Sequence, residues 1–294
     1  MIKKLIDISD LTKEDIEEIF DNIKKLRNTN NDSLMGKSIG MIFEKYSTRT
    51  RISFQVGISQ LKGNAIDLNF ENLNIKRNET FEDTFRIFSC YLDALVYRTD
   101  DHNKIKMGFK YFQKPIINAL SDQSHPCQAL SDIYTIKEHF NFKDNEPFTI
   151  SWLGDVNNVL FSLYQCLDFM PKMKLNIITN KKIHENDKRF IEKNNVSFHY
   201  GIQSSVLTDS HCVMTDVYNS MNDIYDKESE LKFLQVNSEI MEKTGSDTVF
   251  MHCLPANINS EVTEDVIYGS KSIVFKQAEN RLHSQKGILK WLNI

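Results

Sequence analysis

The sequence predicts an α/β protein of two domains, each a parallel β-sheet flanked by helices. Short apolar runs typical of buried strands alternate with amphipathic segments typical of helices, and this alternation is the order of a parallel sheet. It stops near Phe140, at the polar segment 141–147, and then starts again. Because 294 residues are enough for two sizeable cores, we expect one domain at 1–140 and a second at 141–277.

Composition excludes several classes of function. Hydrophobic residues make up 40% of the chain and charged residues 26%, as in ordinary globular proteins. A net charge of -4 gives no reason to expect nucleic acid or an acidic membrane surface as a partner. No apolar run is long enough for a signal peptide or a membrane span. The five cysteines are odd in number and scattered, which favours a reducing cytoplasm and no structural zinc.

The first domain begins with a helix and then enters the strand–helix series. Apolar residues at helical spacing predict a helix over 12–26, with Thr12 as its cap. The run 38–43 predicts a buried strand, and the next helix begins near Ser47 or Thr48. Further expected elements are strand 64–68, helix 80–91, strand 94–97, strand 115–119 and a helix from 126 to about 140.

The start of the second helix has an unusual charge pattern. Ser47 is a good N-cap, but Arg49 and Arg51 lie in the first turn, where the helix dipole disfavours positive charge. Hydroxyl groups, free backbone N–H groups and guanidinium groups together are typical of an anion site, most simply for a phosphate. An ordinary capped surface helix with solvated arginines is the alternative.

Three other places in the first domain are candidates for binding. Arg98 ends a buried strand, where open α/β sheets bind ligands, although a surface ion pair would equally explain it. His125 and Gln128 are three residues apart at a helix start, so both can face one small ligand, although a histidine there can also be only a cap. The polar segment 72–79 has no apolar anchor of its own, so it is either a solvated connection or a contact to something outside its domain.

The second domain repeats the strand–helix order. Strands are expected at 148–153, 174–178, 212–216, 248–251 and 272–275, and a last helix at 279–292. The turn 154–158 contains a single glycine, so it lacks the three-glycine fingerprint of a dinucleotide site. Asp216 and the loop 217–221 follow a strand, at the edge where a parallel sheet places ligands.

Five short motifs, taken together, resemble a known family. They are Ser47-Thr48-Arg49-Thr50-Arg51, Tyr97-Arg98-Thr99, His125-Pro126-Cys127-Gln128, His252-Cys253-Leu254-Pro255 and Ala278-Glu279-Asn280-Arg281. Their types, order and approximate spacing are similar to those of the aspartate and ornithine carbamoyltransferases. The resemblance implies a two-domain fold in which the C-terminal helix, 278–294, returns to the first domain.

The resemblance also implies which residues bind carbamoyl phosphate. In this reaction an amine attacks a carbonyl activated by a phosphate leaving group, and neither a metal nor a redox cofactor is needed. Thr50, Arg98 and His125 would surround the carbamoyl oxygen, and Gln128 with two backbone carbonyl groups would accept from the carbamoyl NH₂. The full implied set is Ser47, Thr48, Arg49, Thr50, Asn74, Arg98, His125, Gln128, Cys253, Leu254 and Arg281.

The second substrate distinguishes the members of the family, and here the resemblance implies ornithine. Asp216 and Cys253 would hold and deprotonate its δ-amine, and they complete a catalytic set with Arg98 and His125. The implied ornithine-binding residues are Asn158, Asp216, Ser220 and Met221. Relatives that use aspartate carry an arginine where this chain has Ala256. Taken alone, Cys253 also fits a small buried hydrophobe.

The resemblance implies a homotrimer with shared active sites, in which the segment 72–79 reaches the neighbouring subunit. Two positions depart from the family pattern: Asn74 replaces a glutamine, and Asn222 replaces a glycine. Asparagine tolerates positive φ, so the loop at 222 can keep its shape. The alternatives to ornithine are another amine, such as putrescine or an acylated ornithine, or a non-catalytic relative that binds phosphate metabolites.

Overall fold

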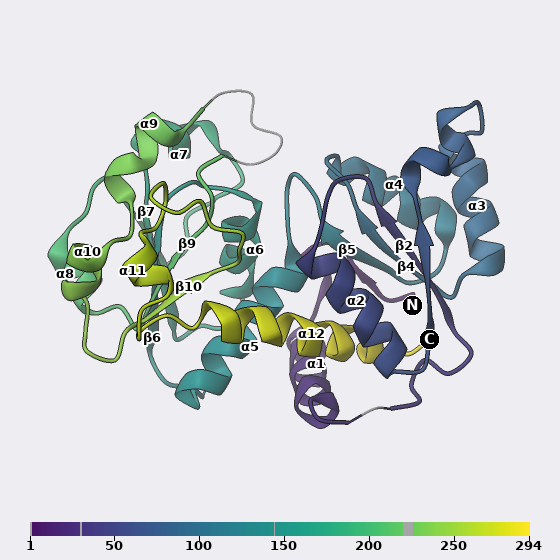
Figure 1. Cartoon of the computed structure of the whole chain (residues 1–294), viewed down its shortest axis with the longest axis horizontal. Helices are drawn as coiled ribbons and strands as arrows, with labels where there is room; N and C mark the ends of the chain where they lie inside the picture. Colours follow the sequence, from purple (N-terminus) through teal and green to yellow (C-terminus); the bar gives the residue numbers. More distant parts are fainter. Residues whose placement is uncertain (1, 30, 144, 220–225) are drawn as a thin grey trace. The chain divides into compact units, whose positions relative to one another are not determined.

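A computed structural model describes residues 2–29, 31–143, 145–219 and 226–294. The chain divides into two compact units, unit 1 with Met1–Tyr134 and Glu279–Ile294, and unit 2 with Thr135–Ala278. Each unit has a five-stranded sheet of parallel strands with helices beside it (Figure 1), which confirms the predicted fold class. The domain boundaries at 140/141 and 277/278 stay a prediction.

The sheet of unit 1 has the strand order β1-β5-β4-β2-β3. Its strands are β1 (Lys4–Leu5), β2 (Ser38–Phe43), β3 (Asn64–Leu68), β4 (Ala94–Arg98) and β5 (Ile116–Leu120). The four central residues of β2 and all five of β4 are buried, because both strands lie inside the sheet and are covered on both faces. Phe43 of β2 lies opposite Arg98 of β4, so the two strands end at the same level.

In the described part of unit 1, four complete helices and parts of two others accompany this sheet. They are α1 (Lys13–Leu26), α2 (Arg49–Gln60), α3 (Phe81–Tyr91), α4 (His102–Phe112), the part of α5 (Pro126–Phe140) up to Tyr134, and α12 (Val274–Trp291) from Glu279 onward. Thr12 caps α1 through a capping box with Asp15, as predicted. The last turns of α12 lie beside α1, where Lys286 Nζ donates to the carbonyl oxygen of Leu26 at 2.5 Å (Figure 1). This contact confirms that the C-terminal helix belongs to the first unit.

The sheet of unit 2 has the strand order β10-β9-β6-β7-β8. Its strands are β6 (Phe148–Leu153), β7 (Met173–Ile178), β8 (Val196–His199), β9 (Cys212–Thr215) and β10 (Val249–His252). Its own helices are α6 (Asn158–Cys166), α7 (Lys181–Asn186), α8 (Ser204–Thr208), α9 (Glu228–Leu231), α10 (Ser238–Glu242) and α11 (Glu264–Ile267). Thr215 of β9 lies opposite His252 of β10, so the residues that follow them leave the sheet side by side.

The predicted strand at 272–275 is wrong. Only Ser272 forms a bridge, to Phe250, and helix α12 already begins at Val274. A run of three apolar residues, Ile273 to Phe275, fits a strand and the first turn of a buried helix equally well, so the run alone could not decide between them. Residues 274–278 therefore extend the last helix by five residues at its amino end.

The expectation that segment 72–79 has no apolar anchor is also wrong. Short 3₁₀ turns occupy Phe70–Asn72 and Asn74–Lys76. The side chains of Leu73 and Ile75 are partly buried against the core cluster of unit 1. The segment is therefore held on its own unit by alternate apolar residues, which the many polar neighbours obscured.

Two smaller findings complete the fold. The N-cap position of α2 falls on Thr48 rather than Ser47, and the Thr48 side chain makes no capping hydrogen bond. Helix α4 has no counterpart among the predicted elements, although Asp101 caps it and Ile105 and Phe112 bury one face. Within the described ranges, no helix combines the length and the apolarity that crossing a bilayer requires.

Candidate active site

The carboxyl ends of three neighbouring strands gather most of the predicted residues of unit 1. Strands β2, β4 and β5 are parallel and adjacent, so the segments that follow them leave the same edge of the sheet. Helix α2 begins there after β2, Arg98 ends β4, and His125 follows β5 directly before α5. The strand order thus places residues that are far apart in sequence at one edge.

Arg281 is the buried centre of this group. Its side chain comes from α12, and the residue is 3% exposed. The guanidinium group donates to the hydroxyl of Thr50 at 2.8 Å and to the amide oxygen of Gln128. The amide nitrogen of Gln128 donates in turn to Asp132 at 2.7 Å. The Gln128 oxygen keeps one lone pair, so it can still accept a hydrogen bond from a ligand.

The electrostatic potential at this edge is positive. Burial, with the charges of Arg281 and Arg98, holds the pKa of His125 well below its ordinary value. The imidazole is therefore neutral at physiological pH, and it can donate a hydrogen bond to a carbonyl oxygen without adding a charge. Two buried guanidinium groups beside a neutral imidazole form a site suited to an anion with a polarisable carbonyl group.

The two arginines of the first turn of α2 differ. Arg51 forms an ion pair with Asp67 on β3, which favours the solvated surface interpretation for that residue. Arg49 is half-buried, and within the described part of the chain no hydrogen bond or ion pair reaches its guanidinium group. Ser47 is half-buried beside it and Thr48 is exposed. Arg49 is thus the first-turn arginine that can bind an anion.

Sequence reasoning missed the carboxylate that fixes the end of β4. The Glu44 side chain is only 6% exposed. It accepts hydrogen bonds from the Tyr97 hydroxyl at 2.5 Å, the Thr99 hydroxyl at 3.0 Å and Lys104 Nζ at 2.7 Å. Tyr97 and Thr99 flank Arg98, and burial with the Glu44 charge raises the pKa of Tyr97. A glutamate directly after a buried strand was the available signal.

Asn74 stands apart from the other predicted residues of unit 1. It lies in the second 3₁₀ turn with its side chain exposed. Among the described residues of this unit, no hydrogen bond or ion pair joins that side chain to the strand ends. The fold of one chain therefore gives Asn74 no bonded contact with the other predicted residues among the described part of this unit.

In unit 2, Asp216 and Cys253 are in direct contact. They follow β9 and β10, which the register places side by side. The Cys253 thiol donates to Asp216 Oδ1 at 2.9 Å, and the Asp216 residue is 6% exposed. Asn158 is half-buried at the first position of α6, after the neighbouring strand β6. Ser220, Met221 and Asn222 lie outside the described residues.

Leu254 follows in a left-handed conformation, with φ of 56°. His252 holds this turn, because its Nδ1 accepts the Leu254 N–H at 2.9 Å. The other ring nitrogen, Nε2, therefore carries the proton and donates to the buried carboxylate of Glu261 at 3.1 Å. Glu261 also accepts the Asn257 N–H at 2.6 Å, so it ties both sides of the turn together.

One group in unit 2 has the composition of a metal site. Ligand atoms of Asp216, His252 and Cys253 lie within 4.8 Å of one another. Both ring nitrogens of His252 are already engaged, so the histidine offers no free lone pair in this arrangement. The remaining pair, a carboxylate and a thiol, is better suited to an ammonium group.

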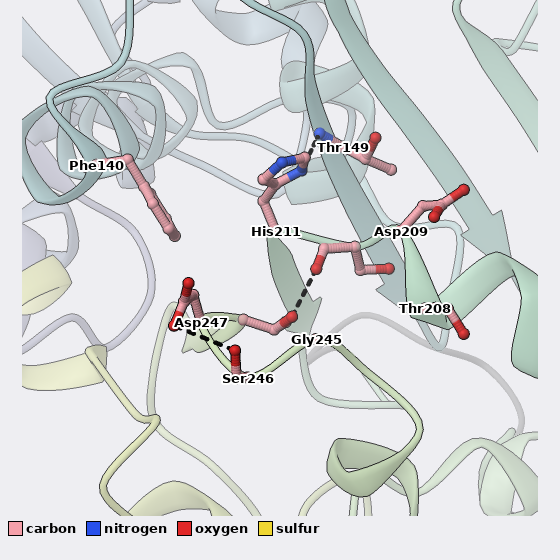
Figure 2. Close-up of a pocket in the computed structure, with 10 residues that line it drawn as sticks. Phe140, Thr149, Thr208, Asp209, His211, Gly245, Ser246 and Asp247 are labelled. Carbon is pink, nitrogen blue, oxygen red and sulfur yellow. Dashed lines mark hydrogen bonds between the residues drawn. The ribbon is translucent and has the colours of Figure 1, made fainter.

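One cavity of unit 2 lies away from these residues. It has a volume of about 490 Å³ and shares no residue with the predicted site. Figure 2 shows residues that line it, among them Thr149 and His211, which lie at the amino ends of β6 and β9, and Gly245, which lies in the turn between α10 and β10. His211 Nδ1 accepts the Thr149 N–H at 3.0 Å, so this ring nitrogen is already engaged and cannot accept a hydrogen bond from a ligand.

Two family models match the chain and together span nearly all of it. The aspartate/ornithine carbamoyltransferase carbamoyl-P binding domain matches residues 3–138, and the Asp/Orn binding domain of the same family matches residues 146–292. Similar proteins include the ornithine carbamoyltransferases of Rhizobium meliloti, 37% identical, and Methanocaldococcus jannaschii, 38% identical. The first match covers 99% of this chain and 98% of the relative, and the second covers 98% of each.

Solved structures agree with these matches. The ornithine carbamoyltransferase of Thermus thermophilus superposes with a TM-score of 0.91 at 30% identity, covering 100% of both chains. That of Pyrococcus furiosus gives a TM-score of 0.87 at 35% identity, covering 98% of this chain and 96% of the other. The chain belongs to the aspartate/ornithine carbamoyltransferase family.

Proposed function

We propose that the protein transfers the carbamoyl group of carbamoyl phosphate to the δ-amine of ornithine, giving citrulline and phosphate. The observation that carries ornithine over aspartate is the contact between Asp216 and Cys253 in unit 2. A buried carboxylate beside a thiol favours a cationic amine and disfavours a second carboxylate. The full-length similarity to ornithine carbamoyltransferases supports the same choice.

Unit 1 would hold carbamoyl phosphate. Arg49, Arg98 and the amino end of α2 supply charge and donors for the phosphate group. The neutral His125 imidazole and the Thr50 hydroxyl would donate to the carbamoyl oxygen, where negative charge develops as the carbonyl is attacked. Arg281 keeps this end of the site positive and orients Thr50 and Gln128. Each such donor contributes about 3–4 kcal/mol to transition-state stabilisation in comparable sites.

Unit 2 would hold ornithine. The δ-ammonium group has to lose a proton before its nitrogen can attack, and an alkylammonium of this kind has a pKa of about 10. Asp216 would bind the ammonium group and take up that proton, with Cys253 beside it. The nitrogen then forms a bond to the carbamoyl carbon, the bond from this carbon to the phosphate oxygen breaks, and phosphate leaves. Asn158, Ser220 and Met221 would bind the α-amino and carboxylate end.

Steady-state rates with a panel of amines test this assignment. Ornithine should give citrulline with saturation kinetics, and aspartate should give no product above the uncatalysed rate. Putrescine and an acylated ornithine, which keep the reacting amine but alter the other end, should be at least tenfold worse. A better rate with either of them would move the activity to that amine. A folded protein without any transferase activity would indicate a binding relative.

We infer a homotrimer whose subunits share active sites. The exposed Asn74 supports this arrangement, because Leu73 and Ile75 anchor its segment on its own unit. Among the described residues, no hydrogen bond joins its amide to the strand ends of that unit. Closed rings repeat one head-to-tail contact, so each subunit would complete the phosphate pocket of the next. None of the five cysteines, all of them within the described residues, forms a disulfide, and this supports the reducing cytoplasm as the compartment in which the protein works.

Complementation tests the shared site. Arg49→Ala would damage the pocket that a subunit owns, and Asn74→Asp the pocket of its neighbour. Each variant alone should keep about a hundredth of wild-type activity or less, whereas co-refolding the two should restore activity approaching about a quarter of wild type if subunits mix at random. If mass spectrometry finds mixed trimers and the mixture stays inactive, the subunits do not share sites.

A further inference from the structure

Asp216 has a second partner that the motifs do not include. Asn157 lies in the turn between β6 and α6 and is 5% exposed. Its amide nitrogen donates to Asp216 Oδ2 at 2.8 Å, while the Cys253 thiol donates to Oδ1 at 2.9 Å. Each carboxylate oxygen thus receives one hydrogen bond from a fixed donor, and the plane of the carboxylate is determined.

The orientation of the Asn157 amide is determined as well. Its oxygen is the N-cap of α6 and accepts the backbone N–H groups of Val159 and Leu160, both at 3.0 Å. Turning the amide over would set its NH₂ group against two N–H donors, which leaves all of them unsatisfied in a buried place. The helix start therefore locks the amide so that its NH₂ group faces Asp216.

Strand order explains why these three residues meet. Strand β9 lies between β10 and β6 in the sheet, so the residue after β9 has a neighbour on each side. Cys253 comes from the β10 side and Asn157 from the β6 side. An ionised carboxylate has about four acceptor positions, so two remain open for an incoming ammonium group.

We propose that Asn157 is the positioning residue for Asp216. It uses the amino end of α6 to hold the carboxylate in the one orientation that leaves its open acceptor positions toward ornithine. This role rests on the function proposed above, because it gives Asp216 the ornithine amine as its substrate. Asn157 itself touches no reacting atom, so it acts through Asp216.

Two substitutions separate positioning from capping. Asn157→Asp and Asn157→Ser both keep a side-chain oxygen that caps a helix well, and both remove the NH₂ donor. Asn237 offers a matched control, since it caps α10 through the Ile240 N–H at 3.0 Å in the same unit without contacting Asp216. Asn237→Asp makes the same chemical change at a cap that lies outside the site.

The kinetic readout is the kcat/KM for ornithine against the KM for carbamoyl phosphate. Both Asn157 variants should lose roughly ten- to hundredfold in kcat/KM for ornithine, the value of one hydrogen bond to a charged group. Their KM for carbamoyl phosphate should change less than threefold, and Asn237→Asp should stay within twofold of wild type throughout. Wild-type kcat/KM in the folded Asn157→Ser variant would overturn the proposal.

A second readout does not depend on turnover. The rate at which iodoacetamide alkylates Cys253, measured by peptide mass spectrometry, depends on the environment of its thiol. That thiol donates a hydrogen bond to Asp216. The alkylation rate should change at least threefold in the Asn157 variants, with the exposed Cys90 as internal reference. A change in this rate without any citrulline formation by wild type would keep the positioning role and remove the proposed function. Unchanged Cys253 reactivity, or failure of both variants to fold, would make Asn157 a cap only.

Discussion

Replacing Arg281 by methionine should remove carbamoyl-phosphate use and leave the fold intact. The guanidinium group lies at the centre of the buried group of unit 1, where it donates to Thr50 and Gln128. Methionine has a similar length and no charge, so the packing of α12 against the unit should persist. The change therefore isolates the charge and its two hydrogen bonds.

The magnitude follows from opposing contributions. Two hydrogen bonds from a charged donor contribute about 1.5–3 kcal/mol each, but burying a guanidinium group costs several kcal/mol. The lowered pKa of His125, caused by burial and then by Arg281 and Arg98, indicates that the potential here is already positive. We expect the free energy of unfolding without ligand to change by about 1 kcal/mol or less. In the transition state of carbamoyl transfer, the loss of this charged group should cost about 3–4 kcal/mol.

Kinetics and thermal unfolding together measure both quantities. The kcat/KM for carbamoyl phosphate should fall about a hundred- to thousandfold. At a ligand concentration of about 100 times the wild-type Kd, wild type gains about 2.7 kcal/mol of stability, and a variant that binds a hundredfold more weakly gains about 0.4 kcal/mol.

Arg27→Met is the matched control for Arg281→Met. The Arg27 guanidinium also contacts α12, through Asn280 at 3.1 Å and Glu279 at 3.2 Å. The Arg27→Met variant should therefore keep kcat/KM for carbamoyl phosphate and the stability gained from that ligand near the wild-type values. If the Arg281 variant kept kcat/KM within tenfold, or lost more than about 3 kcal/mol without ligand, Arg281 would be a structural residue.

Three further predictions concern charge. Arg49→Ala should lower kcat/KM for carbamoyl phosphate about a hundredfold, while Arg51→Ala, which breaks only a surface ion pair, should cost less than about tenfold; equal losses would contradict the anion role. Removing the Arg281 charge should raise the pKa of His125, because this charge lowers that pKa next after burial. An NMR titration that gives the same His125 pKa in wild type and in Arg281→Met would disprove this. Burial raises the pKa of Asp7, but hydrogen bonds from His102 and Ser124 outweigh it and the pKa is lowered. The ionised Asp7 therefore stabilises the fold above pH ~4, and this contribution is lost as pH falls through the lowered pKa of the folded state. Asp7→Asn should make the free energy of urea unfolding depend less on pH on the acid side. An unchanged pH dependence would refute this prediction.

The sequence was sufficient for the elements whose signals are local. Thr12 with Asp15 forms a capping box, and the helix after it appears as predicted. Strands β2 and β6 coincide with the predicted runs because both are apolar, short and bounded by polar residues. In these places propensity, patterning and burial all favour the same structure.

Signals that depend on packing were not sufficient. Val274 and Phe275 belong to a helix because α12 continues through them, which an apolar run of three cannot reveal. Leu73 and Ile75 anchor a segment that appears polar, since only their packing against the core distinguishes them from solvated residues. Helix α4 differs from these two cases, because its Asp101 cap is a local signal and the helix was nevertheless not predicted.

The same distinction holds for the candidate site. The family motifs contained Arg281 and Gln128, but the hydrogen bond between them joins residues 153 positions apart and needed the fold. Asn157 and Glu44 were not singled out, because each acts through a residue that only strand order brings near it. Motifs thus identify groups that touch a substrate more readily than groups that position them.

The central claim is that the carbamoyl carbon ends on the δ-nitrogen of ornithine. Incubating the purified protein with ¹³C-labelled carbamoyl phosphate and δ-¹⁵N-ornithine, and recording ¹³C NMR spectra, follows that bond directly. The account predicts a citrulline carbonyl signal split by coupling to ¹⁵N, which appears as carbamoyl phosphate disappears and is absent with aspartate. Label found only in the products of spontaneous carbamoyl-phosphate decomposition, or a coupled product formed with aspartate instead, would contradict it.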